Sequence, residues 1–533
     1  MTQLVDTNQA PPFENINLYA HDLTLRAGVG RYHGAWADTG LDRLGDELSR
    51  PESWRLGHDA NRHGPELRTH DRYGERIDQV VFHPAWHALM DRSIKAGLHA
   101  APWADDRPGA HVARAAGFFL TSQVEAGHGC PISMTYSVLP ALRLQPDVAA
   151  RWDAGLTATS YDPSFAPPDE KLGLLVGMGM TERQGGSDVR ANVTTATPSA
   201  DGYRINGHKW FCSAPMNDAF LVLAQAPGGL SCFLLPRWTP EATVNGFHIM
   251  RLKDKLGNRS NASAEVEFVD AYADLIGEEG AGVRTILEMV NHTRLDCVIG
   301  SASGMRQAVT QAVHHATHRS AFGRRLVDQP LMVNVLADLV VESEAATLLM
   351  LRLAAEFDTP TPLRRLATPV AKYWVCKRLP PVVAEALECL GGNGYVEESI
   401  LPRLFRESPV NSIWEGSGNV IALDALRALD RSPDTADALV DELQLGRGEH
   451  PDLDRSIDRV GRLLAHPDDP EVHARRITEL LALTLQGSLL VRYATPAQAD
   501  AFCSSRLGND WGRVFGTLPS RMDLRGIVAG AGF

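Results

Sequence analysis

The spacing of apolar residues changes along the chain. Up to about residue 180, apolar residues recur at helical intervals, as in HVARAAGFFLTSQVEAG, which follows the irregular stretch APWADDRPGA. Helical spacing returns from about 283 to 430 in two long stretches that begin GVRTILEMV and QPLMVNVLA. Between these regions lie short segments rich in branched and aromatic residues, separated by Gly, Pro and Asn: YRINGHKWFCSA, AFLVLAQA, LSCFLLP, FHIMRLK and SAEVEFVDAYAD.

This pattern predicts a mainly α protein with a central antiparallel β domain and an extra C-terminal helical domain. The expected domains are an N-terminal helical domain over 1–180, a β-sheet domain over 181–285, a helical bundle over 286–430 and a further helical domain over 431–533. The stretch RSPDTADALVDE is interpreted as the linker into the last domain. A chain of 533 residues is too long for one hydrophobic core, which agrees with several domains.

Composition restricts the classes of function and the compartment. A net charge of −13 argues against nucleic-acid binding by the whole surface, although a local basic patch stays open. The seven cysteines are scattered and odd in number, which favours reduced thiols over a disulfide framework. The N-terminus lacks the basic and apolar regions of a signal peptide, and no stretch is long and apolar enough to span a membrane. We therefore expect a cytoplasmic protein without membrane contact.

Chemistry is first indicated by the loop MTERQGGSDV, residues 180–189. Its glycines let backbone N–H groups approach an anion, and its Thr and Ser hydroxyls can donate to a ring nitrogen or a phosphate oxygen. These features suit a nucleotide-like cofactor. The same residue types also form ordinary turns, so the loop alone leaves both interpretations open.

Two longer motifs resolve this ambiguity by resemblance. The first runs from Gly179 to Asp188, and the second from Glu388 through GGNGY to Glu407. Both are similar to signatures of the acyl-CoA dehydrogenase flavoproteins, and the helix–strand–helix order is also that of the family. The resemblance implies one FAD per chain. It also implies an oxidoreductase that introduces an α,β double bond into a short or branched acyl-CoA thioester.

A narrower resemblance covers nearly the whole chain. The segments FENINLYAHD, CPISMTYSVLP, RLKDKLGNRSNAS and PVNSIWEGSGN, together with the extra region of about 100 residues at the C-terminus, are similar to the AidB branch of alkylation-response flavoproteins. That resemblance implies an alternative function: a flavoprotein that binds double-stranded DNA and protects it in an alkylation response, with little acyl-CoA turnover. A third interpretation is a scaffold that keeps FAD only for stability.

The family resemblance implies a set of cofactor-binding positions. Thr181 would donate to the flavin edge, Phe211 would pack on the ring, and Arg319 would reach the cofactor of a neighbouring subunit, which predicts a homotetramer built as a dimer of dimers. Gln329 is less firmly placed, because the gap from Phe322 is one residue shorter than usual. Phe211 as a core aromatic and the glycines as a helix cap are the structural alternatives. The full set is Met178, Thr181, Ser187, Phe211, Cys212, Ser213, Arg319, Phe322, Gln329, Gly391, Gly392, Ile413, Trp414, Gly416, Ser417, Gly418 and Asn419.

Glu415 in WEGSGN is the predicted catalytic base. Removal of a proton α to a thioester needs a carboxylate beside the substrate with a pKa raised by burial, and the electron pair then leaves to the flavin. The alternative is an ordinary Glu at a helix N-terminus. Some relatives place the base on an earlier helix, where this chain has Thr293 beside Arg294. The resemblance assigns Ser187 and Arg294 to the substrate.

The C-terminal region carries the DNA hypothesis. Residues 431–533 hold twelve arginines, no lysine and fifteen acidic residues, so binding requires the arginines to gather on one face. Alternatively, they pair with the aspartates and the region only builds a subunit interface. Arg427 and Arg513 are the preferred DNA contacts among Arg427, Arg447, Arg475, Arg476, Arg492, Arg506, Arg513, Arg521 and Arg525. No metal site is expected, because HHATH at 314–318 has no carboxylate or Cys partner in the sequence.

Overall fold

The computed structural model describes residues 8–465 and 469–532, and this part of the chain forms two compact units. The first unit comprises the described residues of 1–51, 108–123 and 297–533, and the second comprises 52–107 and 124–296. The division into four sequence domains stays a prediction.

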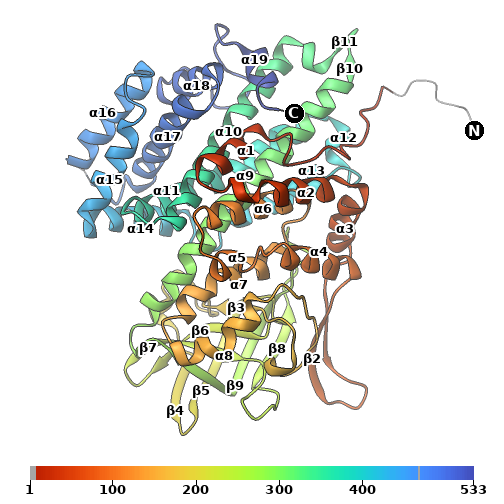
Figure 1. Cartoon of the computed structure of the whole chain (residues 1–533), viewed down its shortest axis with the longest axis vertical. Helices are drawn as coiled ribbons and strands as arrows, with labels where there is room; N and C mark the ends of the chain where they lie inside the picture. The colour runs from red at the N-terminus through yellow and green to blue at the C-terminus, as the bar shows by residue number, and fades with distance from the viewer. Residues whose placement is uncertain (1–7, 466–468, 533) are drawn as a thin grey trace, which may run out of the picture. The chain divides into compact units, whose positions relative to one another are not determined.

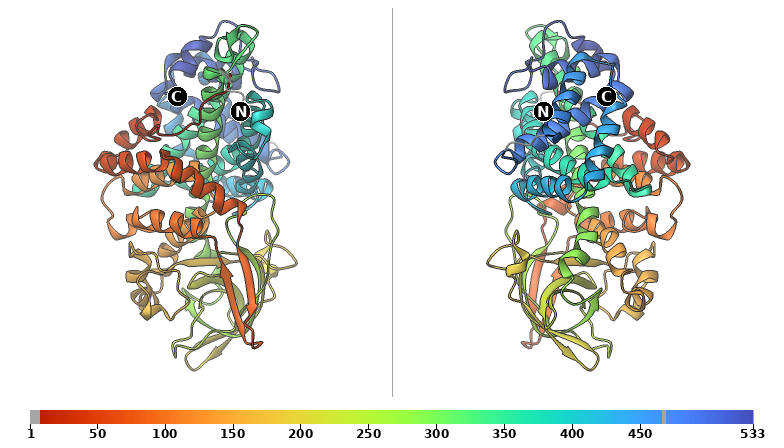
Figure 2. Two further views of the ribbon diagram at one scale, coloured as in Figure 1. Left: turned by 90° about the vertical axis from the view of Figure 1, so that its right-hand side faces the viewer. Right: turned by 90° about the vertical axis from the view of Figure 1, so that its left-hand side faces the viewer.

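A seven-stranded sheet dominates the second unit (Figures 1 and 2). Its strands are β3 (Val176–Gly179), β4 (Thr195–Ser199), β5 (Gly202–Ser213), β6 (Ala219–Ala226), β7 (Gly229–Pro236), β8 (Phe247–Leu252) and β9 (Ser263–Ile276). Five of them are the five apolar segments predicted from the sequence, which are therefore confirmed as strands. The other two, β3 and β4, are short, and the alternation that marks a strand is weak in VGMG and TATPS.

The sheet is mixed rather than purely antiparallel, and its strands form a closed ring. β6 pairs with β4, β4 with β5, β5 with β9, β9 with β7, and β7 returns to β6. The β3–β6 and β4–β6 pairings are parallel. The chain between the paired strands is long enough for β6 to run in the same direction as β3 and β4, whereas a two-residue hairpin can join only antiparallel strands. Most of β6 is buried, as expected of a strand covered on both faces.

Helices pack on this sheet and complete the second unit. Leu139 of α7 and Trp152 of α8 join Leu221 of β6 and Leu234 of β7 in one core. A hairpin of β1 and β2 interrupts the region predicted as mostly helical, because its turn contains Gly74 at φ 86°, a conformation that favours glycine. The elements are α3 (Pro51–Arg62), β1 (Glu66–His70), β2 (Arg76–Val81), α4 (Pro84–Lys95), α5 (Ala101–Ala104), α7 (Gly129–Leu142) and α8 (Pro146–Thr157).

The first unit is helical (Figure 1). The two long helices predicted from apolar spacing are confirmed as α9 (Gly282–His318), which belongs to the first unit from Cys297 onward, and α10 (Pro330–Asp358). A small hairpin lies between them. The remaining elements up to residue 431 are α1 (Leu23–Arg31), α2 (Asp38–Ser49), α6 (Ala110–Val124), β10 (Ser320–Ala321), β11 (Arg324–Arg325), α11 (Leu363–Cys389), α12 (Gly392–Tyr395), α13 (Leu401–Glu407) and α14 (Gly418–Arg431).

The C-terminal region of the first unit packs directly on these helices. α17 contacts α10, α11 and α14. The predicted linker is helical instead: only Ser432 separates α14 from α15, and Pro433 begins the new helix at a position that proline tolerates. The elements are α15 (Pro433–Gln444), α16 (Pro451–Ala465), α17 (Ala474–Tyr493), α18 (Pro496–Phe502) and α19 (Leu524–Ala529).

The described part of the chain contains neither a disulfide nor a helix that could span a membrane. Within the described residues, no helix combines the length and the apolar character needed to cross a bilayer. The seven cysteines, all of which lie in that part of the chain, form no disulfide, and six of them are buried.

Candidate active site

The loop after β3 is built around a buried carboxylate. Glu182 and Lys209 both have fully buried side chains, and Lys209 Nζ lies 2.7 Å from Glu182 Oε1. The ammonium also donates to the carbonyl of Leu223 at 2.8 Å. The carboxylate accepts the backbone N–H groups of Val193 and Thr194 at 2.8 and 3.2 Å. The carboxylate thus holds both ends of the loop and joins them to Lys209 of β5, which in turn is bonded to β6.

The Glu182–Lys209 pair is charged. Burial raises the pKa of Glu182, but the Lys209 charge and hydrogen bonds from Lys209, Thr194 and Gln184 outweigh burial and hold it at about 2. Burial lowers the pKa of Lys209, and Glu182 opposes that shift. A charged pair without solvent contact is retained only when its remaining hydrogen bonds are made, as they are here.

This support fixes the predicted cofactor residues of the loop. Trp210 N–H donates to the carbonyl of Thr181 at 2.8 Å, which joins the loop to β5. A Cβ on Gly186 would overlap the Thr181 hydroxyl, so this position requires glycine. Ser187 is exposed and Thr181 is half-buried, so the side chains of both predicted donors reach the surface of this unit. Met178 lies half-buried on β3.

Phe211 lies on β5 with 53% of its surface exposed, so the alternative of a core aromatic is wrong. The pairing of β5 with β9 shifts register between Lys209 and Cys212, and such an irregularity re-aims side chains. Phe211 therefore faces outward while Cys212 is buried, and burial raises the pKa of that thiol to about 12. Ser213 is half-buried, with its Oγ 3.5 Å from Ser263 Oγ.

Glu415 occupies a strained turn in the first unit. Its φ is 59°, in the left-handed region that non-glycine residues rarely adopt, and Gly416 follows at φ 108°. Lys372 Nζ donates to the carbonyl of Gly416 at 2.5 Å, and Trp414 Nε1 donates to Asn411 Oδ1 at 2.9 Å. The surrounding contacts thus hold the half-buried Glu415 in one backbone conformation.

The turn precedes helix α14 rather than forming its first turn. α14 begins at Gly418 with Ser417 as its N-cap, and its first turn contains no acidic residue. The interpretation of Glu415 as an ordinary residue of a helix N-terminus therefore does not describe its position. Ser417 and Asn419 are exposed at the start of this helix, and Ile413, two residues before Glu415, has 63% of its surface exposed.

The hairpin after α9 and the turn after α11 share a contact with the N-terminal segment. Arg319 Nη1 donates to the carbonyl of Asn8, and Asn393 Nδ2 donates to Gln9 Oε1 at 2.8 Å. Gln329 Nε2 instead donates to Ala321 within the hairpin, at 2.9 Å. A Cβ on Gly391 or Gly392 would meet no atom within 4 Å, so open space adjoins this turn.

These features fit the FAD that the sequence predicts. Phe211 offers the flat apolar surface that a flavin ring covers, and Thr181 and Ser187 offer hydroxyl donors. At Gly391, where a Cβ would meet no other atom, a cofactor can approach the backbone closely. The predicted residues form two sets, because Glu415, its turn and the Arg319 hairpin belong to the first unit, whereas Phe211, the β3 loop and Arg294 belong to the second. Arg294 and Thr293 are buried on α9, where Thr293 Oγ1 donates to the carbonyl of Val290 at 3.0 Å.

Sequence reasoning missed the side chains that support these turns. Lys372 is a buried lysine in the apolar run PVAKYWVC, and a lysine within such a run is the signal in the sequence that marks this position as unusual. Arg475 of α17, whose Nε donates to Asn419 Oδ1 at 2.8 Å, carries no such signal. Its partner lies 56 residues away, and only the packing of α17 on α14 brings them together.

The structure also tests the nine arginines proposed for DNA. Arg506 is fully buried with Asp338 and Glu342, so it cannot touch DNA. Arg492 is mostly buried with Glu442, which removes it as well. Arg447, Arg521 and Arg525 form ion pairs, as the pairing alternative predicts. Arg427, Arg475, Arg476 and Arg513 are exposed, and none of these four has an ion pair within the described part of the chain.

A buried Ser–His–Glu series in the second unit has the order of a hydrolase triad. His128 lies between Ser93 Oγ at 3.0 Å and Glu125 Oε2 at 2.8 Å. All three side chains are almost fully buried, and Glu125 also accepts from Ser260 and Asn61. A substrate cannot reach this serine, so the series joins segments of the fold.

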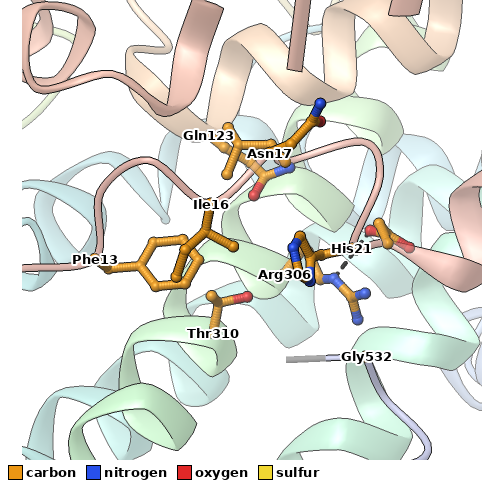
Figure 3. A pocket seen from close by; sticks show the side chains of 10 residues that line it. Phe13, Ile16, Asn17, His21, Gln123, Arg306, Thr310 and Gly532 are labelled. Atoms are coloured by element: carbon orange, nitrogen blue, oxygen red, sulfur yellow. Dashed lines mark ion pairs between the residues drawn. The ribbon is translucent and has the colours of Figure 1, made fainter. Parts of the chain in front are cut away.

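A small hollow in the first unit is lined by residues of the N-terminal segment and of α9 (Figure 3). Arg306 lies beside it and pairs with Asp22 and Glu344, both at 2.9 Å, and donates to the carbonyl of Ala531 at 3.1 Å. These bonds hold the chain near its C-terminal end. His314 of the HHATH motif contacts the carbonyl of Pro11, and no group of three potential metal ligands occurs in residues 8–465 and 469–532.

Comparisons with known proteins assign the chain to a family. The profile "Adaptive response protein AidB N-terminal domain" matches residues 8–163. The profiles "Acyl-CoA dehydrogenase, middle domain" and "Acyl-CoA dehydrogenase, C-terminal domain" match residues 177–271 and 280–429. The chain is 47% identical to AidB of Escherichia coli (strain K12) over 508 residues, which cover 94% of each protein.

Solved structures agree with this assignment. The crystal structure of Caenorhabditis elegans ACDH-11 in complex with C11-CoA has a TM-score of 0.84 at 28% identity, over 93% of this chain and 91% of that chain. An acyl-CoA dehydrogenase from Bacillus anthracis complexed with FAD shares the fold, with a TM-score of 0.61 at 19% identity over 80% and 81% of the two chains. The protein thus belongs to the acyl-CoA dehydrogenase family of FAD-dependent oxidoreductases, within its AidB branch.

Proposed function

We propose that this flavoprotein dehydrogenates a short or branched acyl-CoA thioester with Glu415 as the base. The observation that carries the proposal is the turn at Glu415, which places a half-buried carboxylate in a strained conformation fixed by Lys372 and Trp414. Strain of this kind is retained where the surroundings impose it, and it concentrates at functional sites. The C11-CoA complex of ACDH-11 supports an acyl-CoA ligand.

The roles of the residues follow from the two groups that the reaction removes from the substrate, a proton from the α-carbon and a hydride from the β-carbon. The Glu415 carboxylate accepts the α-proton, and its backbone N–H polarises the thioester oxygen, which stabilises the developing enolate. Bound FAD supplies the electron acceptor for the hydride that leaves the β-carbon. Thr181 and Ser213 hold the flavin edge, Phe211 packs on the ring, and Ser187 and Arg294 contact the substrate.

Anaerobic addition of acyl-CoAs tests this function. We expect the FAD-loaded protein to lose its yellow colour when a short or branched acyl-CoA is added, because a substrate transfers two electrons to the flavin. The absorbance is followed in a stopped-flow instrument, with free CoA as the control. A panel of short, branched and longer acyl-CoAs that leaves the flavin oxidised throughout would contradict the proposal.

A second function, binding of double-stranded DNA by the C-terminal region and the adjoining end of α14, is supported by Arg513 and Arg427. Both are exposed and lack an ion pair in the described residues, whereas Arg447 and Arg521 pair with Asp458 and Asp510. Cations not engaged with protein carboxylates are the ones that can release counterions from phosphates. Contact would be to the DNA backbone and independent of base sequence.

Combined substitution of the two arginines tests this site. We expect Arg427→Ala with Arg513→Ala to weaken DNA binding and to reduce the slope of log K against log salt by about 1.8, since each phosphate contact contributes about 0.9. The matched control is Arg447→Ala with Arg521→Ala, which removes the same charge from ion-paired positions. Equal effects of the two double variants would reject the site, and no binding by the wild type at low salt would reject the function.

A homotetramer built as a dimer of dimers, located in the cytoplasm, completes the proposal. Phe322 is fully exposed at φ 53°, and Leu331 and Tyr395 have 83% and 80% of their surfaces exposed. Exposed apolar side chains mark a protein interface where they gather into one patch, as a subunit contact at these positions would require. Phe322 lies in the hairpin whose Arg319 would reach the cofactor of a neighbouring subunit.

A further inference from the structure

One ammonium group contacts two consecutive aromatic side chains of β5. Lys253 Nζ lies 3.7 Å from the centroid of the Trp210 ring and 4.7 Å from the centroid of the Phe211 ring. Consecutive residues of a regular strand point to opposite faces, so one cation would not reach both rings. The register shift between Lys209 and Cys212 interrupts that alternation. The irregular part of β5 therefore brings both rings to Lys253.

Lys253 is held in this place by its backbone and by one carboxylate. It directly follows β8, and its backbone N–H donates to the carbonyl of Ser263 on β9 at 2.7 Å. Its Nζ lies 2.5 Å from Glu265 Oε1, and only 11% of the side chain is exposed. Glu265 also pairs with Arg251 at 2.6 Å, and the hydrogen bond from Arg251, together with Lys253, holds the pKa of Glu265 at about 2 against the effect of burial. Two cations therefore share one charged carboxylate.

The surroundings keep the charge beside Phe211 positive. Glu265 offsets one of its two cations, and Arg183, which lies 5.0 Å from the centroid of the Trp210 ring, adds another. Asp254 is exposed, so water and salt screen its negative charge. The contact with the ammonium covers one part of Phe211, and 53% of the surface of this residue stays exposed for a flavin ring.

We propose that Lys253 is a positioning residue that holds a positive charge beside the flavin on Phe211 and thereby raises the reduction potential of the bound FAD. The inference rests on the proposed function, which places the flavin ring on Phe211. A hydride carries one negative charge into the ring, and a nearby cation stabilises that charge. Lys253 is suited to this role, because its low exposure limits the screening by water and salt that weakens a surface charge.

The reduction potential of bound FAD tests this role without substrate turnover. We expect Lys253→Met to lower the ratio of reduced to oxidised flavin about tenfold at a fixed potential, which is a shift of about 30 mV for a two-electron couple. The potential is measured against a reference dye during slow anaerobic reduction of the full chain loaded with FAD.

Two further variants make this result specific. Lys253→Arg keeps the positive charge and should retain a potential near that of the wild type. Arg251→Met is the matched control, because it removes a cation from the same carboxylate at a side chain that is 62% exposed, where solvent screens the charge. An equal shift in the two methionine variants, or no shift in Lys253→Met, would overturn the role of Lys253.

Binding of FAD in its two redox forms separates the effect of the charge from a defect in folding. A charge that stabilises reduced flavin strengthens the binding of reduced FAD relative to oxidised FAD by the same factor as it shifts the redox equilibrium. We therefore expect Lys253→Met to weaken the binding of reduced FAD about tenfold more than that of oxidised FAD, measured by anaerobic titration of the protein without FAD. A loss of affinity that is equal for both forms would show that Lys253 only supports the fold, and would contradict the proposal. Anaerobic flavin reduction by acyl-CoA is scored separately, so failure of this role is distinguishable from failure of the proposed dehydrogenase.

Discussion

Glu415→Gln is expected to lower the rate of flavin reduction by acyl-CoA by about 100- to 10,000-fold, the usual contribution of a general base. The amide keeps the size of the side chain but cannot accept the α-proton. It also keeps the Cβ, so the strain at φ 59° is unchanged and the turn is expected to persist. The rate is measured by anaerobic stopped-flow absorbance with a substrate that reduces the wild type.

Two measurements make the Glu415 result specific. FAD content, read from the visible spectrum, should equal that of the wild type, because the change leaves the flavin-binding residues intact. Glu449→Gln makes the same chemical change at an exposed position of the C-terminal region and should reduce flavin at the wild-type rate. A Glu415→Gln protein that reduces its flavin as fast as the wild type would exclude Glu415 as the base.

The sequence could predict features that depend on local residues. The apolar spacing of α9 and α10 is long and regular, and both helices form where it predicts them. Five of the seven strands in the sheet are also visible as apolar segments. The signature loop is similarly local, because Gly186 must stay small beside Thr181. Positions of this kind can be recognised from one sequence, because the neighbouring residues determine which residue type each position needs.

Features that depend on distant partners could not be predicted. The sequence alone predicts that Arg506 is a surface arginine. Its side chain is nevertheless fully buried, because Asp338 and Glu342, which lie more than 160 residues earlier in the chain, neutralise its charge. α11 continues through Pro369, Pro380 and Pro381, although proline disfavours helix interiors, because tertiary packing outweighs local propensity. The parallel β3–β6 pairing likewise depends on the path of the chain between these strands.

Lys209→Met is expected to lower the free energy of unfolding by about 3–5 kcal/mol, the usual effect of removing one partner of a buried ion pair. Methionine nearly preserves the volume but leaves Glu182 buried without its counter-charge, and the carbonyl of Leu223 loses its donor. The loop that carries Thr181 and Ser187 is attached through Glu182, so weaker FAD binding should accompany the loss. Urea unfolding followed by circular dichroism measures the stability, and FAD titration measures the affinity.

The pH dependence distinguishes the buried pair from a general packing defect. The pKa of Glu182 is held at about 2, below its ordinary value of 4.5, so its stabilisation is complete above pH 4.5 and is lost as the pH falls toward 2. The stability difference between wild type and Lys209→Met should therefore shrink over that range, whereas a packing defect would keep it constant. Lys95→Met is the control, because the exposed Lys95–Asp91 pair should contribute about 1 kcal/mol or less. If Lys209→Met were no more destabilising than Lys95→Met, the buried pair would not be what holds the flavin loop on the sheet.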